Sequence, residues 1–206
     1  MADHNIDDIL KTVYDSDGSI DIREHLELLK QYASGCNSVT ELGVRWVVST
    51  WYFMAGRPKK LTSFDITHFK DYGVNEHILN EVASENGVDF LFIQEDVLIT
   101  DKLQETDLLF IDTLHSYKQL KMELHLHGNK ANKYLIFHDV ISFGEIDEAP
   151  TPVNPEWSEE LATYHNSLKD HEGINQAIVE FLLENKHWHI DKLAVRSNGL
   201  MVLRRD

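Results

Sequence analysis

The chain has 206 residues, of which 42% are hydrophobic and 26% are charged, a composition that is typical of globular proteins and excludes a disordered chain. Its 35 acidic residues outnumber its 19 basic ones, so the formal net charge is -16. A surface of this sign repels phosphate backbones and anionic lipids, and we expect neither nucleic acid nor a membrane surface among its partners.

A chain of this length builds one substantial hydrophobic core, so we predict a single domain over residues 1–206. The only cysteine, Cys36, excludes an intrachain disulfide and a cluster of thiolate metal ligands. The first residues are acidic and do not resemble a secretory signal, and no apolar run approaches the roughly 18–20 residues of a membrane-spanning helix. We therefore expect a cytoplasmic protein.

Short apolar runs alternate with longer amphipathic stretches between residues 22 and 138. Apolar residues at helical spacing predict a helix at 22–33, and a long apolar stretch predicts one at 46–55. A polar helix is predicted at 75–86 and a further helix at 117–127. The short apolar runs predict strands, which fall at 38–43, 60–66, 89–94, 107–112 and 133–138. Four of these strands are nearly continuous apolar runs, as in strands buried on both faces of a parallel sheet. The alternation predicts a doubly wound α/β fold.

The chain changes character after the fifth predicted strand. Residues 145–172 are acidic and irregular and hold all but one of the prolines, so we predict a lid insertion there. An amphipathic helix is predicted at 174–185, and two β-prone runs, 187–195 and 200–204, flank the dipeptide Asn198-Gly199. Asn-Gly between two such runs indicates a hairpin, which adds an antiparallel pair to the parallel sheet.

The first 34 residues form a predicted helical extension that precedes the sheet. Before the helix at 22–33, they are polar and contain Gly18. Three roles stay open for about the first 20 of them: a disordered arm, a lid, or a contact in a homodimer.

Polar residues, most of them acidic, stand at or directly after the carboxyl end of every predicted parallel strand. They are Glu41 and Gly43, Asp65, Glu95 and Asp96, Asp112, and His138 and Asp139. Ligands of open α/β sheets bind at this edge, where loops and helix N-termini converge. Acidic residues also cap the helices that follow strands, which accounts for single positions but poorly for the whole set. The set therefore predicts a binding site at the carboxyl edge.

The spacing of these residues suits an adenosine-containing cofactor. Gly43 allows close approach of the backbone, and the predicted helix from Trp46 offers its N-terminal amides to an anion. Asp65, 24 residues after Glu41, is spaced to hold vicinal ribose hydroxyls, and Asp96 could accept a hydrogen bond from an adenine amino group. The sequence has neither Gly-x-Gly-x-x-Gly nor the lysine of a phosphate-binding loop. A cofactor without a pyrophosphate is the better fit.

The segment from Glu41 to Ser49, Glu-Leu-Gly-Val-Arg-Trp-Val-Val-Ser, resembles the first motif of class I S-adenosylmethionine-dependent methyltransferases. The closest likeness is to the catechol O-methyltransferase-like group and the related metal-dependent sugar O-methyltransferases, and it runs from about Val39 to the C-terminus. It implies a Rossmann-like, seven-stranded, mostly parallel sheet that ends in an antiparallel hairpin. It also implies contacts to S-adenosylmethionine from Glu41, Gly43, Val44, Ser49, Asp65, Asp96 and Val97.

Five of these cofactor contacts have an expected role. Gly43 would pack against the methionine part of the cofactor, and Ser49 would bind its carboxylate. Asp65 would hold the ribose, while Asp96 and Val97 would border the adenine. The sequence departs from the family where further glycines often follow the first one, because Arg45, Trp46 and Val47 stand there instead.

The same resemblance implies a divalent metal site. Asp112 follows the fourth predicted strand, and His138 and Asp139 end the fifth, which maps these three residues onto the metal ligands. His115, three residues after Asp112, falls where the group places its general base, so Asp112 and His115 are the predicted catalytic residues. Oxygen ligands favour Mg²⁺, and an imidazole ligand shifts the preference towards manganese, iron or zinc.

The expected reaction is O-methylation of a small hydroxylated compound such as a sugar or glycoside. A cation beside the hydroxyl lowers its pKa, and neutral His115 can take the proton. Two alternatives stay open. The protein could be an S-adenosylmethionine-binding module in which Val47 impairs turnover, or a metal-dependent hydrolase or hydroxylase that uses Asp112, His138 and Asp139.

Overall fold

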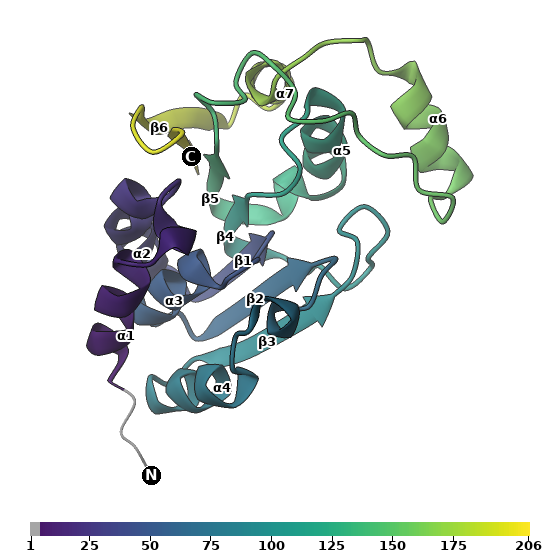
Figure 1. Cartoon of the computed structure of the whole chain (residues 1–206). Coiled ribbons are helices and arrows are strands. Elements are labelled where there is room, and N and C mark those ends of the chain that lie inside the picture. Colours follow the sequence, from purple (N-terminus) through teal and green to yellow (C-terminus); the bar gives the residue numbers. More distant parts are fainter. Residues whose placement is uncertain (1–4) are drawn as a thin grey trace.

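The computed structural model describes residues 5–206, and its centre is a seven-stranded sheet with the order β3-β2-β1-β4-β5-β7-β6 (Figure 1). Strands β1 to β5 are parallel, β7 is antiparallel to β5, and β6 is antiparallel to β7. The strands are β1 (Ser38–Leu42), β2 (Lys60–Asp65), β3 (Asp89–Gln94), β4 (Thr106–Ile111), β5 (Ala131–His138), β6 (Trp188–Ala194) and β7 (Leu200–Arg205). This topology confirms the predicted Rossmann-like, doubly wound sheet with its C-terminal antiparallel hairpin.

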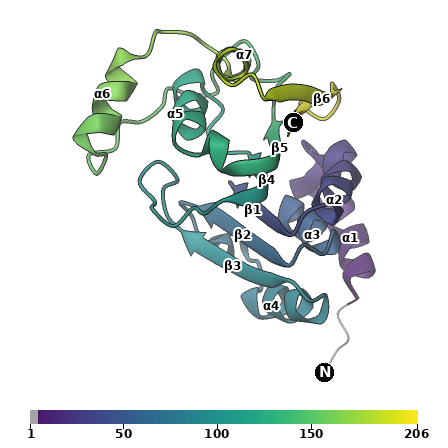
Figure 2. The ribbon, with the colours of Figure 1, turned by 180° about the vertical axis from the view of Figure 1, so that it is seen from behind.

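Helices cover both faces of the sheet, as the opposite views in Figures 1 and 2 show. One face carries α1 (Ile6–Tyr14), α2 (Leu26–Ser34), α3 (Val48–Ala55) and α4 (Glu76–Glu85). The other face carries α5 (Tyr117–His127) and α7 (Ile174–Glu184). Helix α6 (Glu159–Ser167) lies away from the sheet, beyond α5. None of the helices in the described part of the chain is long and apolar enough to cross a membrane.

Strand β4 shows why the parallel strands have continuous apolar sequences. Leu108 and Phe110 belong to the core under α1–α4, whereas Leu109 and Ile111 belong to the core under α5 and α7. Successive side chains of a strand point to opposite faces, so a strand with a core on each side needs apolar residues at every position. The apolar pattern of the sequence thus follows from the two helical layers.

Helix α6 was not predicted, and α1 lies in the predicted helical extension at residues for which no helix range was given. Helix α1 has apolar residues at helical spacing, but it is only nine residues long, and Asn5 caps it by accepting a hydrogen bond from the amide of Asp7. Helix α6 is dominated by polar residues and starts at the cap Ser158, inside the segment predicted to be irregular. The predicted helix at 22–33 begins at Leu26 instead, because residues 23–25 form a tight 3₁₀ turn.

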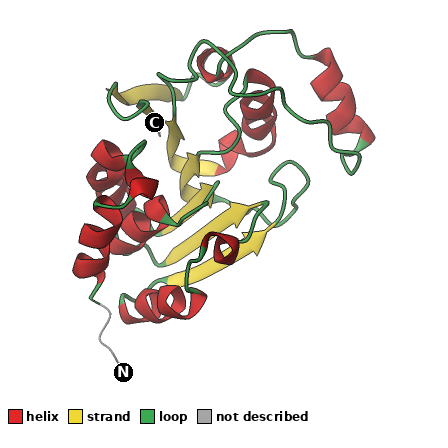
Figure 3. Cartoon of the chain, in the orientation of Figure 1, coloured by secondary structure: helices red, strands yellow, loops and turns green. Residues whose placement is uncertain are grey.

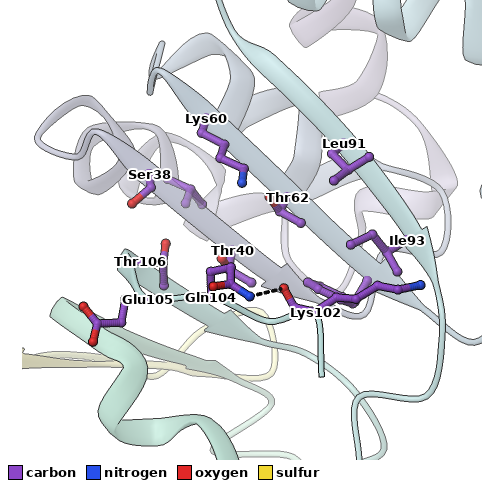
Figure 4. A pocket seen from close by; sticks show the side chains of 12 residues that line it. Ser38, Thr40, Lys60, Thr62, Leu91, Ile93, Lys102, Gln104, Glu105 and Thr106 are labelled. Atoms are coloured by element: carbon purple, nitrogen blue, oxygen red, sulfur yellow. Dashed lines mark hydrogen bonds between the residues drawn. The ribbon is translucent and has the colours of Figure 1, made fainter. Parts of the chain in front are cut away.

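Residues 95–105 connect β3 to β4 without a helix, which Figure 3 shows as an all-green connection. Residues of this connection lie beside the amino halves of β1 and β2. A hollow of about 40 Å³ lies here, large enough for about three water molecules. Figure 4 shows the strand residues that line it, Ser38, Thr40, Lys60, Thr62, Leu91 and Ile93. The hollow is too small for a cofactor and lies away from the carboxyl edge.

Gly43 is required where β1 ends because its backbone lies against the backbone of Asp112. Its φ is +87°, and a Cβ placed on it would lie 2.0 Å from the carbonyl oxygen of Asp112. No rotation of a side chain can relieve an overlap with backbone. Gly87 also has a positive φ, +71°, but a Cβ there would meet nothing within 4 Å.

We predict that Gly43→Ala lowers the free energy of unfolding by about 3 kcal/mol, since it combines a left-handed conformation with a backbone clash. Gly87→Ala, the matched control, carries the conformational cost alone and should lose about 1 kcal/mol. Urea unfolding of both variants measures the difference. Equal losses would show that the contact between Gly43 and Asp112 does not constrain the fold.

Candidate active site

The loop after β1 is held to the end of β2 by the carboxylate of Asp65. One carboxylate oxygen accepts hydrogen bonds from the amides of Val44 (2.8 Å) and Arg45 (3.1 Å). The other oxygen accepts from the amide of Thr67 at 2.8 Å. Each oxygen of a carboxylate can accept two hydrogen bonds, so one acceptor position is left on the oxygen that faces Thr67. Asp65, the predicted ribose ligand, therefore lies beside the loop and fixes the path of that loop.

Non-glycine residues adopt left-handed backbone conformations in this loop, where the methyltransferase motif often has glycine. The φ angles are +47° at Arg45 and +57° at Val47, and such conformations cost about 1–3 kcal/mol each in residues with a Cβ. The side chain of Val47 is buried. Trp46 stays 44% exposed, but its ring packs beside Gly18 and Tyr72. The loop is therefore covered from the N-terminal extension.

Glu41 and Ser49, two predicted cofactor contacts, are bonded to each other inside the protein. The carboxylate of Glu41 is fully buried and accepts hydrogen bonds from the hydroxyls of Ser49, Thr50 (2.7 Å) and Ser63 (2.7 Å). Burial raises the pKa of Glu41 to about 7, although the three hydroxyls act in the opposite direction. The structure thus places both side chains in the core beneath the loop.

Asp96 and Val97 follow β3 and face the predicted lid and α5. One carboxylate oxygen of Asp96 accepts from the amide of Leu98 (2.9 Å) and the other from the side chain of Asn154 (2.8 Å). Val97 is buried, and its carbonyl accepts a hydrogen bond from His127 at 2.7 Å. Asp96 is therefore tied to the 145–172 segment at the edge where adenine is expected.

Four side chains converge where β4 and β5 end, and we call them the Asp-His cluster: Asp112, His115, His138 and Asp139. Nε2 of His115 lies 3.1 Å from Oδ1 of Asp112 and 3.1 Å from Oδ2 of Asp139. Nδ1 of His138 lies 3.2 Å and 3.0 Å from the same two oxygens. The four atoms form a ring in which nitrogen and oxygen alternate. Asp112, His138 and Asp139 are close enough to hold one metal ion.

Backbone geometry sets the position of the cluster. Asp112 follows β4 and is anchored through its amide, which donates to the carbonyl of Leu42 at 2.8 Å. His138 is the last residue of β5, and Asp139 after it has a φ of +62°, which turns its side chain into the protein. His115 lies in the loop before α5, stacked on Phe143 with ring centroids 5.2 Å apart.

Three segments that are distant in sequence supply the outer contacts of the two histidines. Nδ1 of His115 lies 2.9 Å from a carboxylate oxygen of Glu148, in the predicted lid. Nε2 of His138 lies 3.2 Å from the carbonyl oxygen of Asp21 in the N-terminal extension and 3.2 Å from that of Ser197 in the hairpin turn. The extension, the lid and the hairpin therefore all meet at the cluster.

The charges in the cluster stabilise one another. Burial raises the pKa of Asp112, but His138 and His115 outweigh it and hold this pKa well below its usual value. Burial lowers the pKa of His115, but the carboxylates of Asp112, Asp139 and Glu148 outweigh it and raise the pKa to about 9. Burial of His138 is likewise outweighed, and its pKa is raised well above the ordinary value. In the metal-free protein both histidines are therefore cations at neutral pH.

The 145–172 segment bonds to the site at several points and is anchored by its own small core. Glu148 and Asn154 contact His115 and Asp96, and the hydroxyl of Thr151 lies 2.6 Å from that of Ser116. Its core consists of Leu98, Met122, Trp157 and Leu161. Trp157 is buried in this core and anchors the segment. Glu148, Asn154 and Asp21 escape sequence reasoning because their contacts join distant segments that share no motif.

Comparison with known proteins finds similarity only at the level of structure. No protein-family model matches the sequence, and no curated protein matches it. An SAH-bound methyltransferase from Podospora anserina has 13% identity and a TM-score of 0.60, with 98% of this chain and 87% of that chain covered. SAH is S-adenosylhomocysteine, the demethylated product of the cofactor.

Two bacterial O-methyltransferases resemble the chain to a similar extent. The enzyme TomG from Streptomyces achromogenes, involved in tomaymycin synthesis and solved with S-adenosylmethionine, has 12% identity, a TM-score of 0.60, and coverage of 95% and 88%. An O-methyltransferase from Bacillus cereus, solved with SAH, has 16% identity, a TM-score of 0.55, and coverage of 98% and 90%. The chain therefore has the fold of these methyltransferases over nearly its whole length.

The buried Glu41 gives a prediction for the dependence of stability on pH. A carboxyl whose pKa rises from 4.5 to about 7 on folding stabilises the fold below the lower value and loses that contribution as the pH rises through the upper one. We expect the difference in unfolding free energy between the wild type and Glu41→Gln to fall by up to about 1.4 kcal/mol per pH unit in this window.

Denaturant titrations across this pH range measure the effect. The exposed Glu85, replaced as Glu85→Gln, is the matched control, and its difference from the wild type should stay nearly constant. Glu123, a second buried carboxyl with a raised pKa, is present in all three proteins and cancels in the comparison. A constant difference for Glu41→Gln would contradict the raised pKa.

Proposed function

We propose that the protein is an S-adenosylmethionine-dependent O-methyltransferase that acts on a hydroxyl group of a small molecule with the help of a divalent cation. One observation carries this proposal: the loop after β1 touches the Asp-His cluster, since Gly43 lies against the backbone of Asp112. In this arrangement a cofactor on the loop would present its methyl group beside the groups that activate an acceptor. Proximity of this kind is the main requirement of an in-line transfer.

Two observations support S-adenosylmethionine as the cofactor: the similarity of fold and the hydrogen bonds of Asp65. The similar proteins from Podospora anserina, Streptomyces achromogenes and Bacillus cereus are described with SAH or S-adenosylmethionine bound. In our proposal Asp65 orders the loop through the amides of Val44 and Arg45 and accepts a ribose hydroxyl at its free acceptor position. Gly43 keeps the loop close to the cofactor, and Asp96 borders the adenine.

The residues of the Asp-His cluster fit a divalent cation. Asp139 is only 4% exposed, and its Oδ1 has no hydrogen-bond partner in the structure. The loss of hydration of this buried carboxylate oxygen is therefore not offset by a hydrogen bond. A bound cation would supply that compensation, and beside an acceptor hydroxyl it would lower the pKa of that hydroxyl. Asp112, His138 and Asp139 are the residues that would hold it.

In the proposed reaction, the acceptor oxygen forms a bond to the methyl carbon while the bond from that carbon to sulfur breaks. The sulfonium becomes a neutral thioether, and the hydroxyl proton is released to solvent. Residues of the 145–172 segment cover one side of the site through their bonds to His115, Ser116 and Asp96. The net charge of -16 disfavours anionic acceptors, so we propose a neutral or cationic one, such as a sugar or glycoside.

The decisive experiment incubates the full chain with S-adenosylmethionine, a divalent cation and a panel of hydroxylated acceptors, and follows methylated product by mass spectrometry. We expect transfer to at least one neutral or cationic acceptor. Binding of SAH without transfer to any acceptor would favour a cofactor-binding module instead. That alternative draws on one observation, the buried and left-handed Val47 where the family often has glycine.

The role of Asp65 can be tested separately by calorimetry with SAH. Asp65→Ala removes the acceptor of the loop amides and the proposed ribose contact, so SAH should bind about 10–100-fold more weakly. The exposed Asp101 is the matched control, and Asp101→Ala should bind SAH as the wild type does. Unchanged binding by Asp65→Ala would place the cofactor elsewhere.

A further inference from the structure

We propose that strand β3 is an interface for a second copy of this chain, in which the two β3 strands pair antiparallel around a twofold axis at Leu91 and join the two sheets. The inference is independent of the proposed function, because no residue of β3 belongs to the candidate active site. Three features support it: the unpaired backbone of β3, the apolar sequence of this strand, and the charges that would face one another.

Strand β3 forms one edge of the sheet and, among the residues that the structure describes, pairs only with β2 (Figure 1). The amide of Asp89 points to the β2 side, where it donates to the carbonyl of Lys59 at 2.9 Å. Backbone groups along a strand point alternately to its two sides, so those of Phe90 and Phe92 point away from β2. They form a row of donors and acceptors that a further strand can bind.

The two edge strands of the sheet differ in how they are protected against such pairing. Strand β6 has a bulge between Ile190 and Lys192, and the charged residues Asp191 and Lys192 lie at its centre. Strand β3, Asp-Phe-Leu-Phe-Ile-Gln, pairs with β2 without a bulge, contains neither proline nor lysine, and has four apolar residues in its centre. One of them, Leu91, is 46% exposed. Strand β3 is therefore the edge that is open to another strand.

The direction of the backbone groups limits how two β3 strands can pair. In an antiparallel pair, opposite residues that exchange two hydrogen bonds alternate with opposite residues that exchange none. With the twofold axis at Leu91, Phe90 of each copy exchanges hydrogen bonds with Phe92 of the other. The two Leu91 side chains then face each other, and Asp89 of each copy lies opposite Ile93 of the other. Aromatic and aliphatic cross-strand pairs of this kind stabilise a sheet, so the strand is complementary to itself.

Charge complementarity favours this register. Two copies of a chain with a net charge of -16 repel each other unless the surfaces that meet are poor in acids or contain basic groups. Asp89 is the only charged residue of β3, and it would lie opposite Ile93 of the other copy. Ile93 lines the same hollow as Lys102, so each Asp89 would approach a lysine of the other copy (Figure 4). With the axis at Phe92, Asp89 would instead lie opposite the acid Glu95, which pairs with Lys102 in its own chain.

Sedimentation equilibrium of the full chain over a wide range of concentrations tests the association. A strand pair of this length covers less than the roughly 800 Å² per partner that is typical of stable interfaces, so we expect a reversible dimer that forms as the concentration rises. Leu91→Lys brings two ammonium groups face to face and removes two leucines from the interface, so it should weaken the dimer about 10–100-fold.

Leu193→Lys is the matched control, because Leu193 is 48% exposed on the other edge strand, β6. This variant should form dimers as the wild type does. A chain that stays monomeric at every concentration would overturn the proposal. A dimer that Leu193→Lys weakens and Leu91→Lys leaves intact would overturn it as well.

Cross-linking of Leu91→Cys tests the position of the twofold axis. The α-carbons of opposite residues that exchange no hydrogen bonds lie about 4.5 Å apart, which is within the range of a disulfide. Oxidation with copper phenanthroline should therefore join Leu91→Cys into covalent dimers. Leu193→Cys and the wild type, whose cysteine Cys36 is buried, should stay unlinked. Absence of linkage in a folded Leu91→Cys, or linkage of Leu193→Cys in its place, would overturn the proposal, and circular dichroism checks the folding of each variant.

Discussion

The contact between charged groups at the ends of β4 and β5 is the constraint on which the rest of the site depends. Asp112 and Asp139 bring two carboxylates to a largely buried place, where uncompensated charge is strongly unfavourable. The structure compensates them with His115 and His138, and it holds these histidines through outer contacts from three distant segments. The N-terminal extension, the lid and the hairpin are therefore parts of the same site, although none of them belongs to the parallel sheet.

The half of the site where we propose that the cofactor binds is held by backbone contacts. Asp65 accepts two hydrogen bonds from the loop after β1, and Gly43 presses that loop against Asp112. Arg45 and Val47 take left-handed conformations in positions where glycine is easier to accommodate, so the loop stores strain that Asp65 and the packing around Trp46 offset. The loop is thus positioned before any ligand binds, which lowers the entropy lost on binding.

Much of the fold follows from local sequence patterns. The continuous apolar run of β4 indicated a strand with a core on each face, and helix α5 has its predicted bounds, Tyr117–His127. The hairpin was indicated by Asn198-Gly199, although its tight turn is one residue earlier. The amide of Gly199 donates to the carbonyl of Arg196 at 2.8 Å, and the two central residues, Ser197 and Asn198, have positive φ angles. Contacts between distant segments could not be predicted, and Glu148 shows why, since nothing in an irregular acidic stretch specifies which acid meets His115. Glu41 and Ser49 were predicted to contact the cofactor, but they bond to each other in the core. The sequence does not show in advance that neighbouring hydroxyls allow this carboxylate at a strand end to be buried.

The 145–172 segment, the predicted lid, bonds to both halves of the proposed site. Within one segment, Glu148 bonds to His115 in the Asp-His cluster and Asn154 bonds to Asp96 at the cofactor edge. A ligand that strengthens either contact stabilises this position of the segment and so favours the other contact. Linkage makes this relation reciprocal: if an ion in the cluster tightens cofactor binding through the lid, the cofactor tightens ion binding by the same factor. The hydrogen bond between Glu148 and His115 therefore contributes both to the position of the 145–172 segment and to the basicity of His115.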